Sequence, residues 1–279
     1  MSAGSEPARA TFWLLDAPDS LSAQSHREPD GTGLGWFDPA DTPHVSKQAH
    51  AAFSDRTFAR EAREVCSTTF LAHVRFASTG ALEVRNTHPF RQHDRLFAHN
   101  GVIEDLPSLD AHLGDALHLV KGDTDSERLF ALITRETAAR DGDVGAGIEA
   151  ACGWVAANLP VFAINLLLAA SDGLWALRYP ETHPLYVLER DPGESLAHES
   201  SLGMRVHAQA GATRPLVVFA SERMDVDPGW RMLRSGELLH VDDTLRVSGR
   251  MILDRPPARP LSIGDLNPTA QASQAHSAP

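Results

Sequence analysis

Short apolar runs alternate with polar segments along this chain, and their spacing predicts interspersed strands and helices. Alternating or unbroken apolar runs predict extended pieces or strands over residues 12–15, 33–37, 69–76, 95–100, 183–189, 214–222 and 236–247. Residues 162–179 predict a β-hairpin around Asp172-Gly173. Apolar residues at helical spacing predict helices over 56–66, 106–114, 124–140 and 146–159. Because strands lead into several helices and then into a block of hairpins, we expect an α+β fold with helices stacked on antiparallel sheet.

The periodic pattern ends near residue 264. From residue 265 the chain is rich in Pro, Ala, Ser and Gln with few large apolar side chains, which is typical of disorder. We therefore expect one domain over residues 1–264 and a disordered tail over 265–279. A chain of 279 residues is long enough to bury a sizeable core.

Charge and composition narrow the functional classes. The chain has 25 Lys and Arg against 37 Asp and Glu, a formal net charge of -12, without a basic cluster. This balance argues against nucleic acid as a partner and favours a small zwitterionic or cationic substrate. The longest apolar run, residues 162–170, is too short to span a bilayer, and no secretory signal is recognisable. Two cysteines suit a reducing compartment, so we expect a cytoplasmic protein without a membrane partner.

The stretch LFAHNGVIED, residues 96–105, raises the main question of the sequence. It begins as an apolar strand and then breaks at His99-Asn100-Gly101, before two aliphatic residues and two carboxylates. A plain Asn-Gly hairpin turn would need a strand on each side. We therefore expect the Asn-Gly pair to serve a purpose other than a hairpin turn.

Two charged residues stand at the ends of predicted elements. Alternation along residues 69–76 places His73 and Arg75 on one face, and a guanidinium at the end of a buried strand needs an anionic partner. That partner is either a ligand carboxylate or a structural ion pair. Asp125 begins the clearest amphipathic helix, where it either caps the helix or accepts a substrate ammonium group. Together, Arg75 and Asp125 would bind the two ends of an α-amino acid.

Three further signals carry little functional information. The glycines of GTGLG, residues 31–35, lack the context of a nucleotide-binding loop and favour a turn. The 14 histidines show no metal-ligand spacing, so we expect no metal site. Cys66 and Cys152 both lie at predicted helices, where cysteines more often act as small buried hydrophobes than as nucleophiles.

Five motifs, taken in order, carry a resemblance to a known family. They are DGTGLGWF (30–37), AHVRFAS (72–78), NTHPF (86–90), FAHNG (97–101) and GDTDSE (122–127). Together they resemble the class II glutamine amidotransferases, which are N-terminal-nucleophile hydrolases. The match is closest to small stand-alone members, including those that act on γ-glutamyl compounds in ergothioneine biosynthesis. It is strong over about residues 11–135, and residues 217–241 also look like the end of such domains.

The resemblance implies a four-layer αββα sandwich, with two antiparallel sheets between helices. It also implies roles for four residues. Arg75 would bind the α-carboxylate of glutamine, and Asp125 would bind its α-amino group. The side-chain amide of Asn100 and the backbone N–H of Gly101 would form the oxyanion hole for the tetrahedral intermediate.

The resemblance assigns weaker roles to three neighbouring residues. Ser78 and Thr79 occupy a loop that touches the substrate in other members, and Thr79 stands where some members have histidine. Ser78 is therefore expected to bind substrate, while the contribution of Thr79 to specificity is open. His88 would shape the pocket rather than carry protons.

The nucleophile of the family has no counterpart at the start of this chain. In the family it is a cysteine at the mature N-terminus whose own α-amine serves as base, whereas this chain begins MSAGSEPARATFWLL. In related sequences an SAG-like turn follows a first strand that begins with the cysteine. By that register the first strand is missing. The nucleophile belongs about six residues before Met1, up to ~20 Å from Ser2 at ~3.3 Å per residue.

Three explanations compete. The start is truncated and a Met-Cys lies upstream, or Ser2 acts as the nucleophile after Met removal, or the protein is a binder without catalytic activity. Loss of a strand would leave a sheet unpaired, which favours truncation.

We therefore expect a glutamine amidotransferase-like amidohydrolase acting on the γ-amide of glutamine or a γ-glutamyl conjugate, without a cofactor. The alternative is a catalytically inactive glutamine- or γ-glutamyl-binding protein or partner subunit that lacks the nucleophile. No synthase domain is recognisable in this sequence, so ammonia would be released or passed to a separate ammonia-accepting partner.

Overall fold

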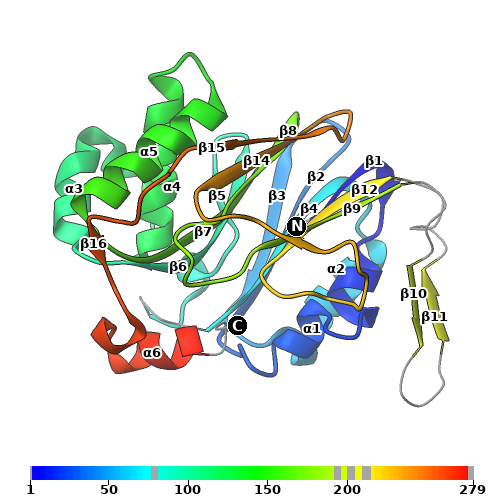
Figure 1. Ribbon diagram of the computed structural model, residues 1–279. Helices are drawn as coiled ribbons and strands as arrows, with labels where there is room; N and C mark the ends of the chain where they lie inside the picture. The colour runs from blue at the N-terminus through cyan, green and yellow to red at the C-terminus, as the bar shows by residue number, and fades with distance from the viewer. Residues whose placement is uncertain (1, 77–80, 192–195, 200–204, 209–214, 276–279) are drawn as a thin grey trace.

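Two antiparallel sheets pack face to face, and helices cover the outer face of each (Figure 1). The computed structural model describes residues 2–76, 81–191, 196–199, 205–208 and 215–275. The layer order is helix, sheet, sheet, helix. This four-layer α+β sandwich confirms the predicted fold class.

The first sheet has the strand order β13-β9-β12-β1-β4-β2-β3. Its strands are β1 (Ser2–Ala8), β2 (Gly31–Phe37), β3 (Pro43–Gln48), β4 (Ser67–Arg75), β9 (Tyr186–Arg190), β12 (Leu216–Ala220) and β13 (Arg231–Met232). β1 is a central strand, because Ser2 lies opposite Phe70 on one side and Val218 on the other. The SAG segment therefore lies within a strand, which corrects the expectation that it forms a turn after a missing strand.

The second sheet has the order β15-β14-β8-β7-β6-β5, and β16 pairs in parallel with β7. Its strands are β5 (Phe90–Gln92), β6 (Arg95–Ile103), β7 (Pro160–Ala170), β8 (Gly173–Leu177), β14 (Glu237–Asp242), β15 (Val247–Met251) and β16 (Arg259–Pro260). The predicted break at His99-Asn100-Gly101 is wrong. β6 runs through these residues to Ile103 because β7 pairs with it along this length.

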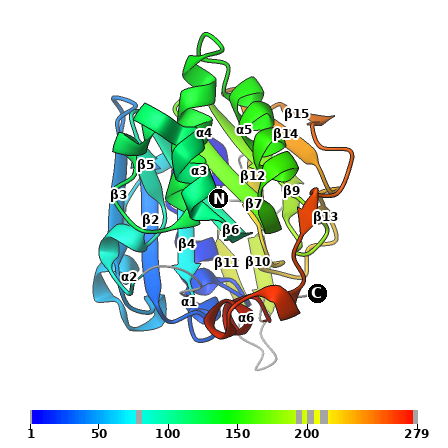
Figure 2. The same ribbon diagram turned by 90° about the vertical axis from the view of Figure 1, so that its left-hand side faces the viewer.

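The outer layers are helical (Figures 1 and 2). The first sheet is covered by η1 (Phe12–Asp16), α1 (Leu21–Gln24), η2 (Ala52–Ser54) and α2 (Arg56–Glu64). The second sheet is covered by α3 (Leu106–Leu113), η4 (Gly114–Leu119), α4 (Asp125–Ala138) and α5 (Val144–Asn158). A short turn, η3 (Val84–Asn86), precedes β5. The predicted extended piece at 12–15 is a helical turn, because it buries three successive side chains, Phe12, Trp13 and Leu14.

The hydrophobic core has a separate part for each interface between layers. Between the sheets, Leu71 of β4, Phe219 of β12 and Leu96 of β6 are fully buried. The second sheet and its helices share a larger cluster that includes Phe97 and Phe130, whose rings stack with centroids 4.8 Å apart. Both sheets are therefore held from two sides by apolar packing.

The C-terminal segment differs from the predicted disordered tail at 265–279. It forms η6 (Ile263–Asp265) and α6 (Pro268–Ala275), and residues 276–279 lie outside the described residues. Leu266 and Ala270, four residues apart, are 3% and 0% exposed and pack against Phe162 and its neighbours on β6 and β7. Two well-placed apolar residues thus order a segment of polar composition.

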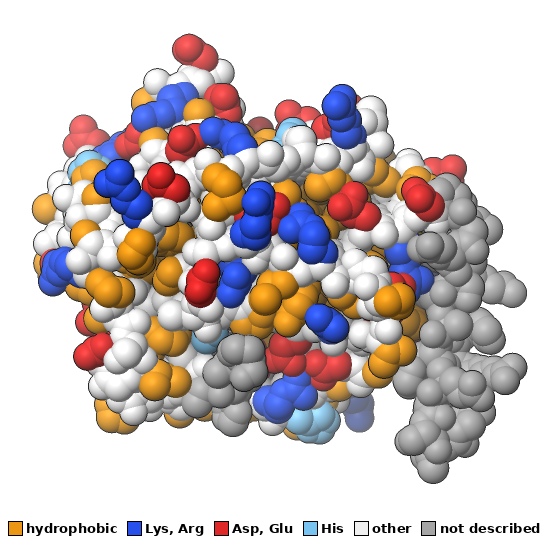
Figure 3. Space-filling model, viewed as in Figure 1, with side chains coloured by type: hydrophobic (Ala, Val, Ile, Leu, Met, Phe, Trp, Pro, Cys, Tyr) orange, Lys and Arg blue, Asp and Glu red, His pale blue; other side chains and the backbone are white. Residues whose placement is uncertain are grey.

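One hairpin stands apart from the two large sheets. β10 (Leu196–Glu199) pairs with β11 (Arg205–Ala208), and the pair projects beside the first sheet (Figure 1). On the face seen in Figure 3, Lys and Arg side chains are interspersed with Asp and Glu, without a continuous basic patch. That face is poorly suited to a phosphate backbone.

Candidate active site

A cavity of about 150 Å³ is lined by residues of both sheets and by residues of α1 and α6. Figure 2 shows these two helices at the same end of the sandwich. Arg75 of β4, Asn100 and Gly101 of β6, and Asp125 of α4 all line it. The structure therefore brings together four of the five residues predicted for the site, from three different elements. Ser78, the fifth, and its neighbour Thr79 lie outside the described residues.

Arg75 is the last residue of β4 and is only 4% exposed. Its Nη1 donates a hydrogen bond to the carbonyl of Ala81 at 3.3 Å. Burial lowers the pKa of the guanidinium, while the charges of Asp30 and Asp125 act in the opposite direction. An arginine remains charged in any protein environment, so the cavity holds a fixed, largely desolvated positive charge that suits a carboxylate.

The glycines of GTGLG belong to β2, which corrects the predicted turn. Gly31 lies opposite Arg75 in the sheet. A Cβ at Gly33 would lie 1.9 Å from the carbonyl oxygen of His88, and one at Gly35 would lie 2.9 Å from Leu96. These glycines therefore let the 86–90 segment and the second sheet approach the strand closely.

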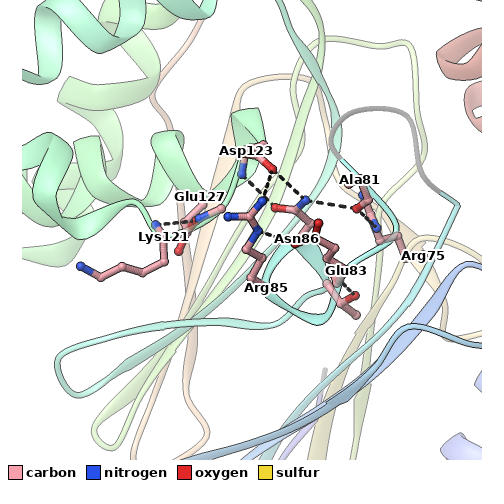
Figure 4. A network of polar contacts seen from close by, with 10 residues as sticks. Arg75, Ala81, Glu83, Arg85, Asn86, Lys121, Asp123 and Glu127 are labelled. Carbon is pink, nitrogen blue, oxygen red and sulfur yellow. Dashed lines mark hydrogen bonds and ion pairs between the residues drawn. The ribbon is translucent and has the colours of Figure 1, made fainter.

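Asn86 joins the loop after β4 to the segment that leads into α4 (Figure 4). Its Oδ1 accepts from the N–H of Asp123 at 2.8 Å, and its Nδ2 donates to Ala81 at 3.1 Å and to Oδ2 of Asp123 at 3.3 Å. Gly122 is required beside it, because a Cβ there would lie 2.3 Å from Asn86 Oδ1. Since Ala81 also accepts from Arg75, this network connects the Arg75 and Asp125 sides of the cavity.

Asn100 and Gly101 lie in β6 opposite Asn165 and Ile164 of β7. Gly101 has a φ of 156°, and a Cβ there would lie 2.0 Å from the carbonyl oxygen of Ala163. Only glycine therefore fits this position without moving β7. Both residues line the cavity, and a side-chain amide and a backbone N–H are the types of donor that oxyanion holes use.

Asp125 is not the N-cap of α4. The cap is Thr124, whose Oγ1 accepts from the N–H of Glu127 at 3.2 Å. The carboxylate of Asp125 is 2% exposed and its Oδ2 accepts from the N–H of Ile103 at 2.9 Å. The capping interpretation of Asp125 is therefore wrong, and its charge lies buried beside β6 at the cavity.

Three buried histidines surround the cavity as neutral rings. Burial is the main cause of the lowered pKa of His99, of the pKa of about 3 at His73, and of a pKa well below the usual range at His88. The His99 ring lies between Ser126 Oγ, 2.9 Å from Nδ1, and the Ala163 carbonyl, 3.2 Å from Nε2. Because that carbonyl can only accept, Nε2 carries the proton and Nδ1 accepts from Ser126. Because these three rings are neutral, the charged groups of the cavity are Arg75 and the carboxylates.

Asn165 and Glu28 are two of the polar cavity residues that had not been predicted from the sequence. Asn165 lines the cavity and is fully engaged: its Nδ2 donates to the carbonyls of His183 at 3.3 Å and Pro184 at 3.0 Å, and its Oδ1 accepts from Tyr179 N–H at 3.1 Å. The available signal was a single amide within the apolar run FAINLLLAA. Glu28 also lines the cavity, and burial raises its pKa to about 7, with Glu222 adding to the shift.

The two cysteines of the chain lie away from the cavity. Cys66 is exposed after α2, and Cys152 is fully buried in α5, where burial raises the pKa of its thiol to about 12. Neither lines the cavity among the described residues. In the same described part of the chain, no group of three or more His, Cys, Asp and Glu side chains is placed to hold a metal ion. None of the described helices is long and apolar enough to cross a membrane.

The cavity lies beyond the N-terminal end of β1, along the direction of the strand. Ser2 is paired with Phe70 of β4 and Val218 of β12. Beyond this level, Ala72 and His73 of β4 and Ser221, just after β12, line the cavity. A chain running on from the N-terminal end of β1, between β4 and β12, would therefore enter the cavity.

Comparisons with known proteins show which family and which proteins this chain resembles. Residues 17–254 match the profile of the family described as glutamine amidotransferases class-II. A γ-glutamyl-hercynylcysteine sulfoxide hydrolase of Mycobacterium tuberculosis (strain CDC 1551 / Oshkosh) is 31% identical over 238 residues, covering 82% of this chain and 85% of the relative. A probable glutamine amidotransferase of Saccharomyces cerevisiae is 31% identical over 151 residues, or 46% of this chain and 42% of the yeast protein.

Among solved structures, the glutamine phosphoribosylpyrophosphate amidotransferase from B. subtilis has a similar fold, with a TM-score of 0.64 at 18% identity. The similarity covers 91% of this chain and 49% of that one. This chain thus spans less than half the length of the yeast protein and of the B. subtilis enzyme, while it spans most of the mycobacterial hydrolase.

Proposed function

We propose, from the fact that this chain belongs to the class II glutamine amidotransferase family, that its cavity binds glutamine or a γ-glutamyl compound and hydrolyses the γ-amide. The observation that carries the proposal is the convergence of Arg75, Asp125, Asn100 and Gly101 on one cavity. A fixed cation, a buried carboxylate and two neutral donors match the carboxylate, the ammonium group and the γ-carbonyl of glutamine.

In this reaction Arg75 binds the α-carboxylate and Asp125 binds the α-ammonium group. A thiolate attacks the γ-carbonyl carbon, and the oxygen takes the negative charge between the Asn100 amide and the Gly101 N–H. Collapse of this intermediate breaks the carbon–nitrogen bond, and the nitrogen takes up the proton that the thiol lost and leaves as ammonia or an amine. A γ-glutamyl thioester remains. Water then attacks the thioester, which gives glutamate and restores the thiol.

Neither of the two cysteines of this chain can supply the thiol that this reaction needs. Cys66 and Cys152 lie away from the cavity. Ser2 is also an unfavourable nucleophile, because it lies level with Phe70, five residues before Arg75 on β4, or ~16 Å at ~3.3 Å per residue. We propose that a cysteine on a continuation of β1 enters the cavity and serves as the nucleophile. A strand extended in the same register reaches the level of Arg75 five residues before Ser2.

A catalytically inactive binding protein or partner subunit is the second candidate. The observation that favours it is the absence of a cysteine from the cavity lining among the described residues. If the chain acts as the hydrolase, ammonia would be released or taken by a separate protein. A cytoplasmic location stays a prediction.

One set of measurements separates the two candidates. Calorimetry of this chain with glutamine and γ-glutamyl dipeptides tests the cavity, and ammonia release tests turnover. A form extended upstream to a Met-Cys start should gain glutaminase activity and lose it when that cysteine is changed to alanine. Binding without turnover in the extended form would instead support the inactive binder, and failure to bind either ligand would contradict both.

A further inference from the structure

The C-terminal helix α6 adds a wall to the cavity from outside the family match. The profile match ends at residue 254, whereas α6 covers Pro268–Ala275. Figures 1 and 2 place α6 at the end of the sandwich, below β6. The residues of α6 therefore lie outside the part of the chain that the family profile covers.

α6 is anchored directly behind the candidate oxyanion hole. Leu266 and Ala270 pack into one cluster with Val102 of β6 and Ala163 of β7. Val102 follows Gly101 in the chain, and the carbonyl of Ala163 occupies the place where Gly101 would carry a Cβ. The position of α6 is thus set by the same residues that position Gly101.

One turn after Ala270, Gln274 reaches the cavity. Its side chain is 4% exposed and lines the cavity together with Asn100 and Gly101. Its Oε1 lies 2.6 Å from Nε2 of His183. An amide oxygen only accepts, so His183 donates this hydrogen bond and holds the Gln274 side chain against the wall.

A continuous set of contacts connects Gln274 to Asn100 of the candidate oxyanion hole. Asn100 lies opposite Asn165, Asn165 donates to the carbonyl of His183, and His183 donates to Gln274. Gln274 is therefore connected through β7 to Asn100, the candidate donor to the γ-carbonyl oxygen.

With Gln274 in place the cavity measures about 150 Å³, below the roughly 300–1,000 Å³ of sites for drug-sized ligands. We propose that Gln274 is a specificity-determining residue, which limits the substituent on the γ-amide nitrogen to a compact group. This inference rests on the proposed function. Shortening the side chain opens the wall and admits larger γ-glutamyl substituents.

The test compares the full chain with Gln274→Ala and with Gln271→Ala. Gln271 is a matched control, because it lies on the same helix and its Nε2 donates to the Leu266 carbonyl at 2.7 Å instead of lining the cavity. Calorimetry measures the affinity for glutamine and for γ-glutamyl-p-nitroanilide, whose amide nitrogen carries a bulky ring. Thermal melts establish that each variant is folded.

We expect Gln274→Ala to raise the affinity for the anilide relative to glutamine by about 10-fold or more, as pocket-size changes do. Gln271→Ala should leave this ratio unchanged. An unchanged ratio in Gln274→Ala, with glutamine still bound by the unsubstituted chain, overturns this inference alone. If the unsubstituted chain binds neither compound, the proposed function fails, and the inference fails with it.

Discussion

The carboxylate of Asp125 is hydrogen-bonded to the backbone N–H of Ile103, with a distance of 2.9 Å between Oδ2 and N. This bond joins the first turn of α4 to β6, two residues after Gly101. The candidate amine-binding group and the candidate oxyanion hole are thus parts of one connected unit. Asn86 joins Arg75 to the same unit through Ala81 and Asp123.

Replacing Arg75 by alanine should weaken the binding of glutamine by about 10-fold or more, because a charge-assisted hydrogen bond in a desolvated site contributes roughly 1.5–3 kcal/mol. Calorimetry gives the two affinities. The matched control is a ligand, 4-aminobutanamide, which keeps the amine and the amide of glutamine but lacks the α-carboxylate. Its affinity should be the same for both proteins, and an equal loss for both ligands would contradict the role of Arg75.

In the form that carries the cysteine extension, Asn100→Ala should lower kcat by roughly 10²–10³ with little change in KM, because the amide is needed when charge develops on the oxygen. Steady-state ammonia release gives both constants. Asn158→Ala, at an exposed amide in α5, is the control and should leave both unchanged. A rise in KM with kcat intact would indicate that Asn100 binds the ground state instead.

Asn86→Ala should lower the free energy of unfolding by about 1–3 kcal/mol, because it removes a fully buried amide and leaves the N–H of Asp123 without its acceptor at a part-buried site. Urea unfolding measures this difference. The same change at exposed Asn158 should stay within about 0.5 kcal/mol. Equal effects at the two positions would show that the network around Asn86 adds nothing to stability.

Glu28 should make the protein less stable as pH rises. Its pKa is raised from 4.5 to about 7, chiefly by burial and then by Glu222 and Asp19, with Arg27 opposing the shift. The native state therefore holds a proton that the unfolded state releases. The corresponding stability is fully present below pH 4.5 and is lost as pH rises through about 7.

Glu28→Gln removes this titration, so the fall in Tm between about pH 5 and 8 should become smaller in the variant. Glu64→Gln is the control, since the Glu64 side chain is 70% exposed. A fall in Tm of the same size in the Glu28 variant would mean that another group causes it.

Thiol titration should distinguish the two cysteines. One thiol, that of exposed Cys66, should react promptly with a disulfide reagent in the native protein, and a second should react only after denaturation. Cys152 is protected because it is buried and its thiol pKa is raised to about 12. Two prompt thiols in the native protein would contradict the packing of α5.

The sequence predicts the shared parts of the molecule well. Five ordered motifs indicate the family, and with it the αββα sandwich and the meeting of Arg75, Asn100, Gly101 and Asp125 in one cavity. These motifs are readable because each needs particular residue types at fixed spacing. The roles of the four residues and of Ser78 stay predictions.

The features that sequence reasoning missed depend on partners far away in the chain. The local sequence around Asn100-Gly101 predicts that the strand ends there, yet pairing with β7 keeps β6 extended. The sequence predicts that Gly33 belongs to a turn. In the structure it lies in a strand, where the lack of a Cβ makes room for His88. The composition after residue 265 predicts disorder. The segment is ordered because Leu266 and Ala270 pack against the surface formed by Phe162 and its neighbours, which the sequence of the segment does not reveal.

The central position of β1 also has a practical consequence for anyone who expresses this protein. In most domains a fusion partner or affinity tag at the N-terminus extends into solvent, whereas here an added peptide that continued the line of β1 would run between β4 and β12 toward the cavity. An N-terminal tag would therefore compete with ligand for the same space. Recombinant forms meant for ligand screening should carry no N-terminal tag residues.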